Sequence, residues 1–176
     1  MLEKKTQTSE YYKKLYDLKS LVEEGGSYSL VIKSNDEVIR SQLKENDLTR
    51  PAMTSIYYML EGKQTSAFHI LKSDEIWHYY DGDSSVNIYE IDLHGVLTTT
   101  LLGSPVRYQG AVFQNLVQRG NYFAAELNNI YGFALMGCTF APGFSNEDFS
   151  IAQADLILRY PQHKELIARL FSKDLL

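Results

Sequence analysis

The sequence predicts a mainly β fold, an antiparallel sandwich or barrel with an N-terminal helix and C-terminal helices. Between residues 27 and 140, short runs rich in β-branched and aromatic residues follow one another at regular spacing. Turn residues separate the runs and no helical pattern lies between them, which favours antiparallel pairing. Composition agrees, because 13 tyrosines stand against 8 phenylalanines and 1 tryptophan, and aromatic residues suit strands.

The first element is an amphipathic helix over residues 9–23. Its apolar residues recur at helical spacing: Tyr12, Leu15, Leu18 and Val22. Ser9 can cap its start, and Gly25 and Gly26 supply the permissive backbone that ends it.

The β region follows, over about residues 27–140. The expected strands are 27–32, 55–60, 66–71, 75–80, 86–91, 96–102, 111–117, 121–127 and 133–140. Residues 34–53 are polar and rich in turn residues, so we expect a long loop there.

The helical pattern returns after residue 144, and we expect C-terminal helices over about residues 146–172. Ser145 or Asn146 can cap a helix that begins with EDFSIAQADL. Pro161 suits the first position of a last helix. Its inward residues are Leu166, Ile167 and Leu170. Because no repeat or linker divides the chain, we expect a single domain over residues 1–176.

Composition and charge exclude several classes of function. The net charge is −5 and the basic residues are scattered, which argues against nucleic-acid binding. No apolar run is long enough to cross a membrane, and the N-terminal residues lack the apolar core of a signal peptide. Cys138 is the single cysteine and therefore forms no intrachain disulfide. We expect a cytoplasmic protein.

The stretch AFHILKSDEIWHYYDGD, residues 67–83, carries the candidate chemistry. Strand alternation puts His69 on one face with Leu71 and puts Glu75, Trp77 and Tyr79 together on one face of the next strand. The same alternation places His78 on the opposite face. A metal site formed by His69, Glu75 and His78 together is therefore not expected. The KSD turn predicts a tight hairpin of the two strands, in which His69 and Glu75 can meet on one wall.

These residues carry a resemblance to a known family. The spacing His69-x-Leu71-x3-Glu75-x6-Gly82 resembles the first motif of the cupins, and EGGSY (24–28), TSIYYML (54–60) and GFALMGCTFAPGF (132–144) followed by EDF resemble the cupin_5 family, once named DUF985. The resemblance implies a small jelly-roll (cupin) barrel. It also implies a homodimer, because small single-domain cupins are commonly dimers.

The departures from the family pattern bear on metal binding. Metal-binding cupins carry a second histidine where this chain has Leu71, and a further histidine where Phe123 falls. One histidine and one carboxylate seldom hold a transition metal without two more fixed donors. We therefore expect neither a metal nor another cofactor, and favour a metal-free pocket over a metal-dependent cupin oxygenase.

The first functional interpretation is a metal-independent enzyme similar to isomerases and epimerases, acting on a sugar-like or carbonyl metabolite. His69 would be the base, Glu75 would orient its ring, and Tyr79 would be the acid. Tyr122 and Tyr131 would reach the pocket from neighbouring elements.

The alternatives are a module that binds a small molecule without turnover and a purely structural cupin. In the binding module, the ligand's identity is unknown, and its pocket is lined by Trp77, Phe123 and Leu71. In the structural protein, His69 and Glu75 are a hydrogen-bonded pair in the core.

Overall fold

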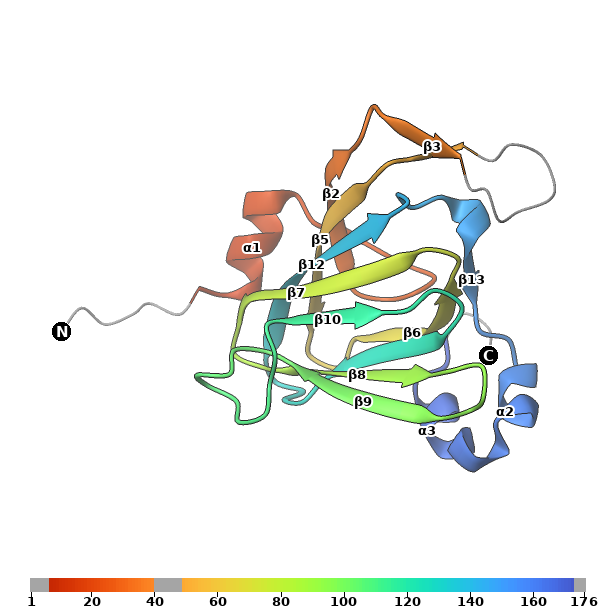
Figure 1. Cartoon of the computed structure of the whole chain (residues 1–176). Helices are drawn as coiled ribbons and strands as arrows, with labels where there is room; N and C mark the ends of the chain where they lie inside the picture. The colour runs from red at the N-terminus through yellow and green to blue at the C-terminus, as the bar shows by residue number, and fades with distance from the viewer. Residues whose placement is uncertain (1–6, 40–48, 173–176) are drawn as a thin grey trace.

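Two antiparallel sheets build most of the described chain, which comprises residues 7–39 and 49–172 of this computed structural model (Figure 1). The six-stranded sheet has the order β1-β2-β5-β12-β7-β10, and the five-stranded sheet has the order β13-β6-β11-β8-β9. Consecutive strands therefore alternate between sheets in several places. This arrangement confirms the mainly β, antiparallel architecture predicted from the sequence.

Nine strands match the nine predicted β-runs to within three residues at either end, whereas β1 and β13 fall where helices were expected. The six-stranded sheet contains β1 (Lys19–Ser20), β2 (Ser27–Lys33), β5 (Thr54–Glu61), β12 (Phe133–Ala141), β7 (Asp74–Gly82) and β10 (Gln114–Val117). The five-stranded sheet contains β13 (Phe149–Ile151), β6 (Thr65–Leu71), β11 (Tyr122–Leu127), β8 (Val86–Ile91) and β9 (Leu97–Leu102).

The expected hairpin between residues 66–71 and 75–80 is wrong. β6 belongs to the five-stranded sheet and β7 to the six-stranded sheet, so the short link between them crosses from one sheet to the other. β6 pairs instead with β11 and β13, and β7 pairs with β12 and β10. His69 and Glu75 therefore stand on opposite walls of the barrel rather than side by side.

The N-terminal helix α1 spans Ser9–Tyr16, so the predicted helix over residues 9–23 is too long at its C-terminal end. Thr8, rather than Ser9, caps it, and Asp17 ends it in the left-handed conformation with φ of 49°. The chain then turns into β1, which pairs with β2. Residues 19–20 therefore pair with the edge of the sheet instead of continuing the predicted helix. The helix α1 packs on the outer face of the six-stranded sheet, where the rings of Tyr16 and Tyr57 stack at 3.9 Å.

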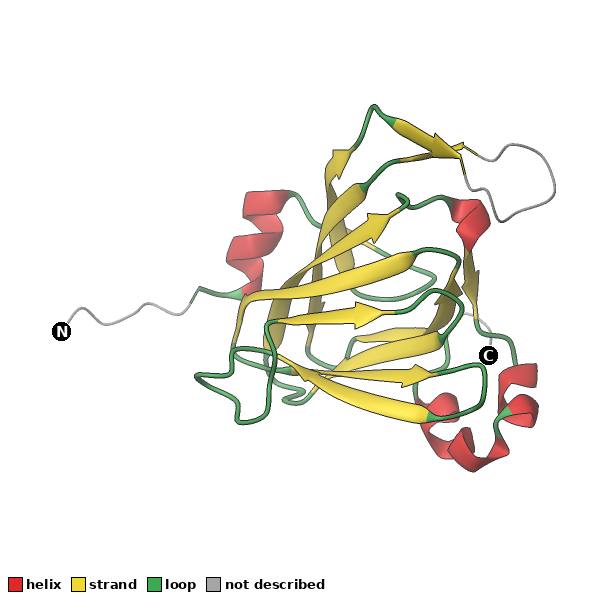
Figure 2. Ribbon diagram, in the orientation of Figure 1, coloured by secondary structure: helices red, strands yellow, loops and turns green. Residues whose placement is uncertain are grey.

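The C-terminal region begins with the short helix η1 (Asn146–Asp148) and the strand β13, so the expected helix over EDFSIAQADL is wrong at its start. Phe149 packs against the interior core, and its strand pairs with β6. These contacts explain why residues 149–151 form a strand instead of the predicted helix. Helical structure follows in α2 (Asp155–Arg159), η2 (Pro161–His163) and α3 (Lys164–Arg169). These helices cover the five-stranded sheet (Figure 2), with Ile167 and Leu170 fully buried as predicted.

The segment 34–53, expected to be a loop, contains the paired strands β3 (Glu37–Ile39) and β4 (Thr49–Pro51). Residues 40–48 lie outside the described residues. A buried ion pair fixes β4, because the Arg50 Nε–H donates to Asp148 Oδ2 at 2.8 Å. The Arg50 Nη2 group also donates to Glu147 at 2.8 Å.

Among the described residues, no helix has the length and apolar character needed to span a membrane.

We expect Arg50→Ala to lower the free energy of unfolding by about 3 kcal/mol, because the buried Asp148 loses its ion pair with the Arg50 guanidinium. Arg169→Ala is the matched control, since Arg169 pairs with Glu126 while half of its side chain is exposed, and it should cost less than about 1 kcal/mol. Chemical denaturation measures both values. Equal losses in the two variants would contradict this role for Arg50.

Candidate functional site

A β-bulge in β6 determines which polar side chains of this strand point into the barrel interior. Phe123 of β11 pairs with His69, whereas Ala125 pairs with Ser66, so the register shifts between these pairs. Phe123 and Ala125 both belong to the interior core. Because cross-strand partners share a face, the bulge turns both Ser66 and His69 inward. The uninterrupted alternation expected for this strand holds only from Phe68 to Leu71.

His69 is held in one orientation between two rings. Its side chain is only 2% exposed, and its Nδ1 lies 2.7 Å from the carbonyl oxygen of Ala67. Because a carbonyl only accepts hydrogen bonds, Nδ1 carries the hydrogen and Nε2 is the nitrogen left for other partners. The rings of Phe123 and Phe149 lie 4.0 and 5.3 Å from the imidazole.

Glu75 is a buried acid on the facing sheet. It is 3% exposed, and its Oε2 has no hydrogen-bond partner among the described residues. Burial, helped by the charge of Glu24, raises the pKa of Glu75 from 4.5 to about 8. Trp77 and Cys138 oppose this shift, although the Trp77 Nε1–H meets no described acceptor in hydrogen-bond geometry. The Glu75 carboxyl therefore keeps its proton at neutral pH.

Three polar residues outside the predicted site complete this interior layer: Glu24, Tyr58 and Ser66. The Ser66 hydroxyl donates to Glu24 Oε1 at 2.6 Å, and the Tyr58 hydroxyl donates to the Gly25 carbonyl at 2.9 Å. Burial raises the pKa of Tyr58, and the charge of Glu24 adds to the shift. EGGSY was the available signal, but its glycines were interpreted as the end of a helix.

The expected hydrogen bond between His69 and Glu75 is not formed among the described residues, and Ala67 orients the imidazole instead. Tyr79 faces the interior, but its hydroxyl donates to the carbonyls of Gly82 and Ser84, each at 3.1 Å. It stands four residues from Glu75, about 13 Å along the strand. The structure therefore does not bring Tyr79 to the imidazole as an acid.

The other predicted residues divide between interior and surface. Leu71, Trp77 and Phe123 all belong to the interior core, whereas Tyr122 packs on the opposite face of β11 against Tyr160. Tyr131 is 90% exposed, so neither tyrosine lines the interior. Tyr122 follows the alternation of its strand, and Tyr131 lies in a turn after β11.

The outward direction predicted for His78 agrees with the structure. On β7, Glu75, Trp77 and Tyr79 are buried, while Tyr80 is half exposed and stacks on the His78 ring with an interplanar angle of 7°. Alternation therefore separates His78 from His69.

A cavity of about 440 Å³, which we call the mouth cavity, is lined by neighbours of His69 and Glu75. Its lining residues are Leu21, Val22, Glu23, Glu24, Tyr28, Leu30, Lys33, Thr54, Ile56, Phe140, Phe144, Asn146 and Phe149. Phe149 contacts the His69 ring, and Phe140 is the cross-strand partner of Glu75. The Phe144 ring lies 5.6 Å from that of Phe140 and 6.1 Å from that of Phe149, so three phenyl rings form one wall of the cavity, which we call the phenyl wall.

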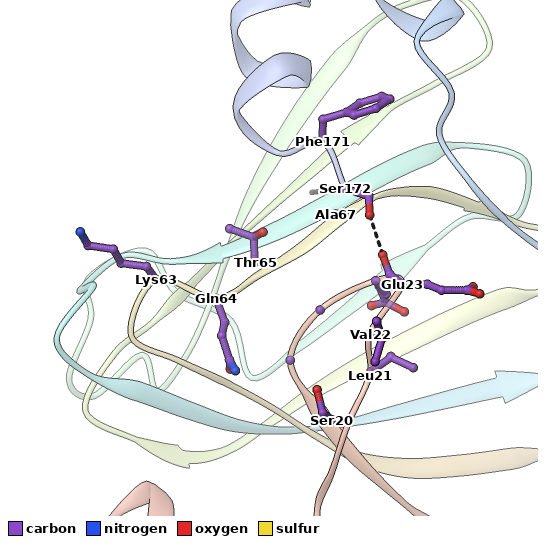
Figure 3. Close-up of a pocket in the computed structure, with 13 residues that line it drawn as sticks. Ser20, Leu21, Val22, Glu23, Lys63, Gln64, Thr65, Ala67, Phe171 and Ser172 are labelled. Atoms are coloured by element: carbon purple, nitrogen blue, oxygen red, sulfur yellow. Dashed lines mark hydrogen bonds between the residues drawn. The ribbon is translucent and has the colours of Figure 1, made fainter. Parts of the chain in front are cut away.

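Residues 21–26, which we call the strap, divide the mouth cavity from a second cavity of about 320 Å³ (Figure 3). The Ala67 N–H donates to the Glu24 carbonyl at 2.8 Å, and the Ser172 hydroxyl donates to the Glu23 carbonyl at 3.0 Å. Gly25 has a φ of +104°, and a Cβ there would lie 2.1 Å from the Thr65 carbonyl oxygen. Only glycine fits this close approach.

The donor set does not fit the metal site of metal-binding cupins. The described residues contain no group of three or more His, Cys, Asp or Glu side chains arranged to hold a metal ion. Leu71 and Phe123, at the positions where the family pattern has histidines, are apolar and buried. A transition metal needs more fixed donors than His69 and Glu75 provide.

Comparison with known proteins identifies the family. The model of the Cupin_5 family, described as "Cupin superfamily (DUF985)", matches residues 10–152. The chain belongs to this family. A search of curated proteins found no match.

Solved structures agree with this cupin assignment. The chain is 34% identical to a protein from Shewanella oneidensis, with a TM-score of 0.80, over 94% of this chain and 98% of that one. It is 27% identical to a hypothetical protein from Leishmania major, with a TM-score of 0.85, over 95% and 100%. An oxalate decarboxylase from Bacillus subtilis shares the fold alone, with 17% identity, a TM-score of 0.51 and coverage of 90% and 38%. The predicted jelly-roll cupin fold with terminal helices is confirmed.

We expect Glu75 to make stability fall as the pH rises. Because its pKa is 4.5 when exposed and about 8 when folded, only the unfolded chain ionises between these values, so raising the pH favours unfolding. Glu75→Gln should remove this dependence and be more stable than the wild type at pH 9 by on the order of a few kcal/mol. Chemical denaturation from pH 5 to pH 9 measures the effect.

The matched control is Glu165→Gln, which changes an exposed carboxyl on α3. It should keep the pH profile of the wild type. A Glu75→Gln profile that parallels the wild type would contradict the protonated, buried state of Glu75.

Proposed function

We propose that this cupin binds a small molecule in the mouth cavity. The observation that carries the proposal is the cavity itself, whose volume of about 440 Å³ is within the range typical of sites for small ligands. Its walls are mainly rings and aliphatic side chains, with a few polar groups among them. Such a lining supports binding of a partly apolar metabolite whose orientation is set by a few hydrogen bonds.

The surrounding strands hold the phenyl wall of this cavity in place. The Phe144 N–H donates to Thr54 Oγ1 at 2.8 Å, which fixes the segment after β12 against β5. Phe140 is buried within β12, and Phe149 is carried by β13. A ligand would therefore meet a largely preformed surface, which lowers the ordering cost of binding.

A screen of metabolites for thermal stabilisation tests this proposal, because a ligand that binds only the folded state raises its melting temperature. Leu30→Trp should abolish most of the stabilisation given by a hit, since Leu30 lines the cavity and a larger side chain would fill it. The control is Val31→Trp, an exposed neighbour outside the lining. Equal stabilisation of both variants would place the ligand elsewhere.

Proton transfer is a second candidate function, favoured by the state of Glu75. A carboxyl that titrates near pH 8 can donate a proton to a carbonyl oxygen while the free Nε2 of His69 removes a proton from the adjacent carbon. The resulting enol would return by the reverse transfers, which is the chemistry of an isomerase or epimerase. Because both side chains are almost fully buried, Phe149 must move before a substrate reaches them.

Incubation in D2O with carbonyl compounds found in the screen tests this candidate. Deuterium should enter the carbon next to the carbonyl, and His69→Gln or Glu75→Gln should slow its entry by about 100-fold or more. Mass spectrometry measures the exchange. His78→Gln is the control, because His78 faces outward and should leave the rate unchanged. Unchanged exchange in His69→Gln would exclude His69 as the base.

We further propose that the protein is a cytoplasmic homodimer. Apolar side chains on the outer face of the six-stranded sheet support self-association. Ile76, Tyr80 and Leu116 are 38%, 50% and 50% exposed, and Ile76 pairs with Leu116 across β7 and β10. Side chains of this kind on one sheet face favour burial against another copy of the chain.

A further inference from the structure

The mouth cavity has an acidic end formed by the strap. Glu23 and Glu24 line the cavity beside Leu21 and Val22. Glu24 is half-buried, so its carboxylate is partly withdrawn from water, whereas Glu23 is exposed. The two carboxylates bring negative charge to a cavity whose other walls are mostly apolar, and a low-polarity wall strengthens the field of such charges.

Glu24 is held in place by a neutral donor. Its Oε1 accepts the Ser66 hydroxyl at 2.6 Å, and within residues 7–39 and 49–172 it forms no ion pair. The uncompensated charge is felt in the interior, where it helps to raise the pKa of both Glu75 and Tyr58. The carboxylate is therefore oriented before any ligand arrives and has no counter-charge among the described residues.

Lys33 is the cationic residue among the described residues that line the cavity, and it stands at the far end. It is exposed at the end of β2, five residues beyond Tyr28, which is about 16 Å along a strand. Over this distance, near solvent, its field at Glu24 is largely screened. The end of the cavity nearest the strap therefore keeps its negative charge.

Aromatic rings face the same cavity. Tyr28 lies at the start of β2, close to the strap in the chain, and Phe140, Phe144 and Phe149 form the wall over the polar layer. An aromatic face attracts a cation through its quadrupole, and this attraction grows when the site is withdrawn from water. The Glu24 carboxylate and the aromatic rings thus both favour a cationic ligand.

We propose that the mouth cavity takes an organic cation, a molecule with an apolar or aromatic body and an ammonium group that lies beside Glu24. This inference rests on the proposed binding function and specifies the ligand class. The ammonium group would donate to the Glu24 carboxylate, and the apolar body would cover the phenyl wall. A neutral molecule of the same shape gains only the packing of its apolar body on the phenyl wall, and an anion is repelled by the Glu24 carboxylate.

Three probes of similar shape test the charge directly: 2-phenylethylamine, 2-phenylethanol and 3-phenylpropionate. Titration calorimetry and melting temperature should show the amine binding about tenfold or more tightly than the alcohol, with no binding of the propionate. Added salt should weaken the amine and leave the alcohol unchanged. This salt series needs only the wild-type protein.

Glu24→Gln keeps an acceptor for Ser66 and removes the charge of Glu24, so it should lower the affinity for the amine towards that for the alcohol. Glu37→Gln, an exposed carboxyl on β3 outside the cavity, should retain the wild-type preference. Equal or tighter binding of the alcohol or the propionate, or an unchanged preference in Glu24→Gln, would overturn the proposal. Failure of all three probes would also overturn the cation class, while the metabolite screen decides separately whether the cavity binds anything.

Discussion

The structure depends on how the space between the two sheets is filled. A series of rings runs through it, from Phe149 to His69 at 5.3 Å, from His69 to Phe123 at 4.0 Å, from Phe123 to Trp77 at 6.5 Å and from Trp77 to Tyr58 at 5.4 Å. Because these residues come from both sheets, their packing holds the walls at a fixed separation. The same packing decides which polar atoms inside the barrel find partners.

Glu75 is the clearest consequence of this packing. An apolar interior cannot solvate a carboxylate, so the group stays protonated, and its Oε2 and the Trp77 Nε1–H remain without described partners. Burying polar atoms in this way destabilises the fold, and an apolar pair of similar size would pack there at lower cost. Their position beneath the mouth cavity supports a role in handling a ligand. The charge of Glu24 links the two layers, because it borders the cavity and also acts on Glu75.

Local patterns in the sequence predicted part of this arrangement. Period-two alternation placed Glu75 and Trp77 inside and His78 outside correctly, because that property belongs to a single strand. The pairing partner of a strand, in contrast, is not a property of that strand alone. The Lys72–Ser73 link therefore could not reveal that β6 and β7 belong to different sheets. Long-range pairing also explains why residues 149–151 are a strand. The hydrogen bonds of the Tyr79 hydroxyl depend on the end of β7 and the turn after it, where Gly82 and Ser84 supply the acceptors, and strand alternation does not predict them.

The central claim is that ligands bind between the strap and the phenyl wall. The most direct measurement is a series of two-dimensional amide NMR spectra of the labelled protein during titration with a ligand that stabilises it. The largest shifts should fall on residues of the mouth cavity, such as Tyr28, Thr54 and Asn146. Shifts confined to Lys63, Thr65 and Phe171, which line the second cavity, or to the outer sheet face would contradict it.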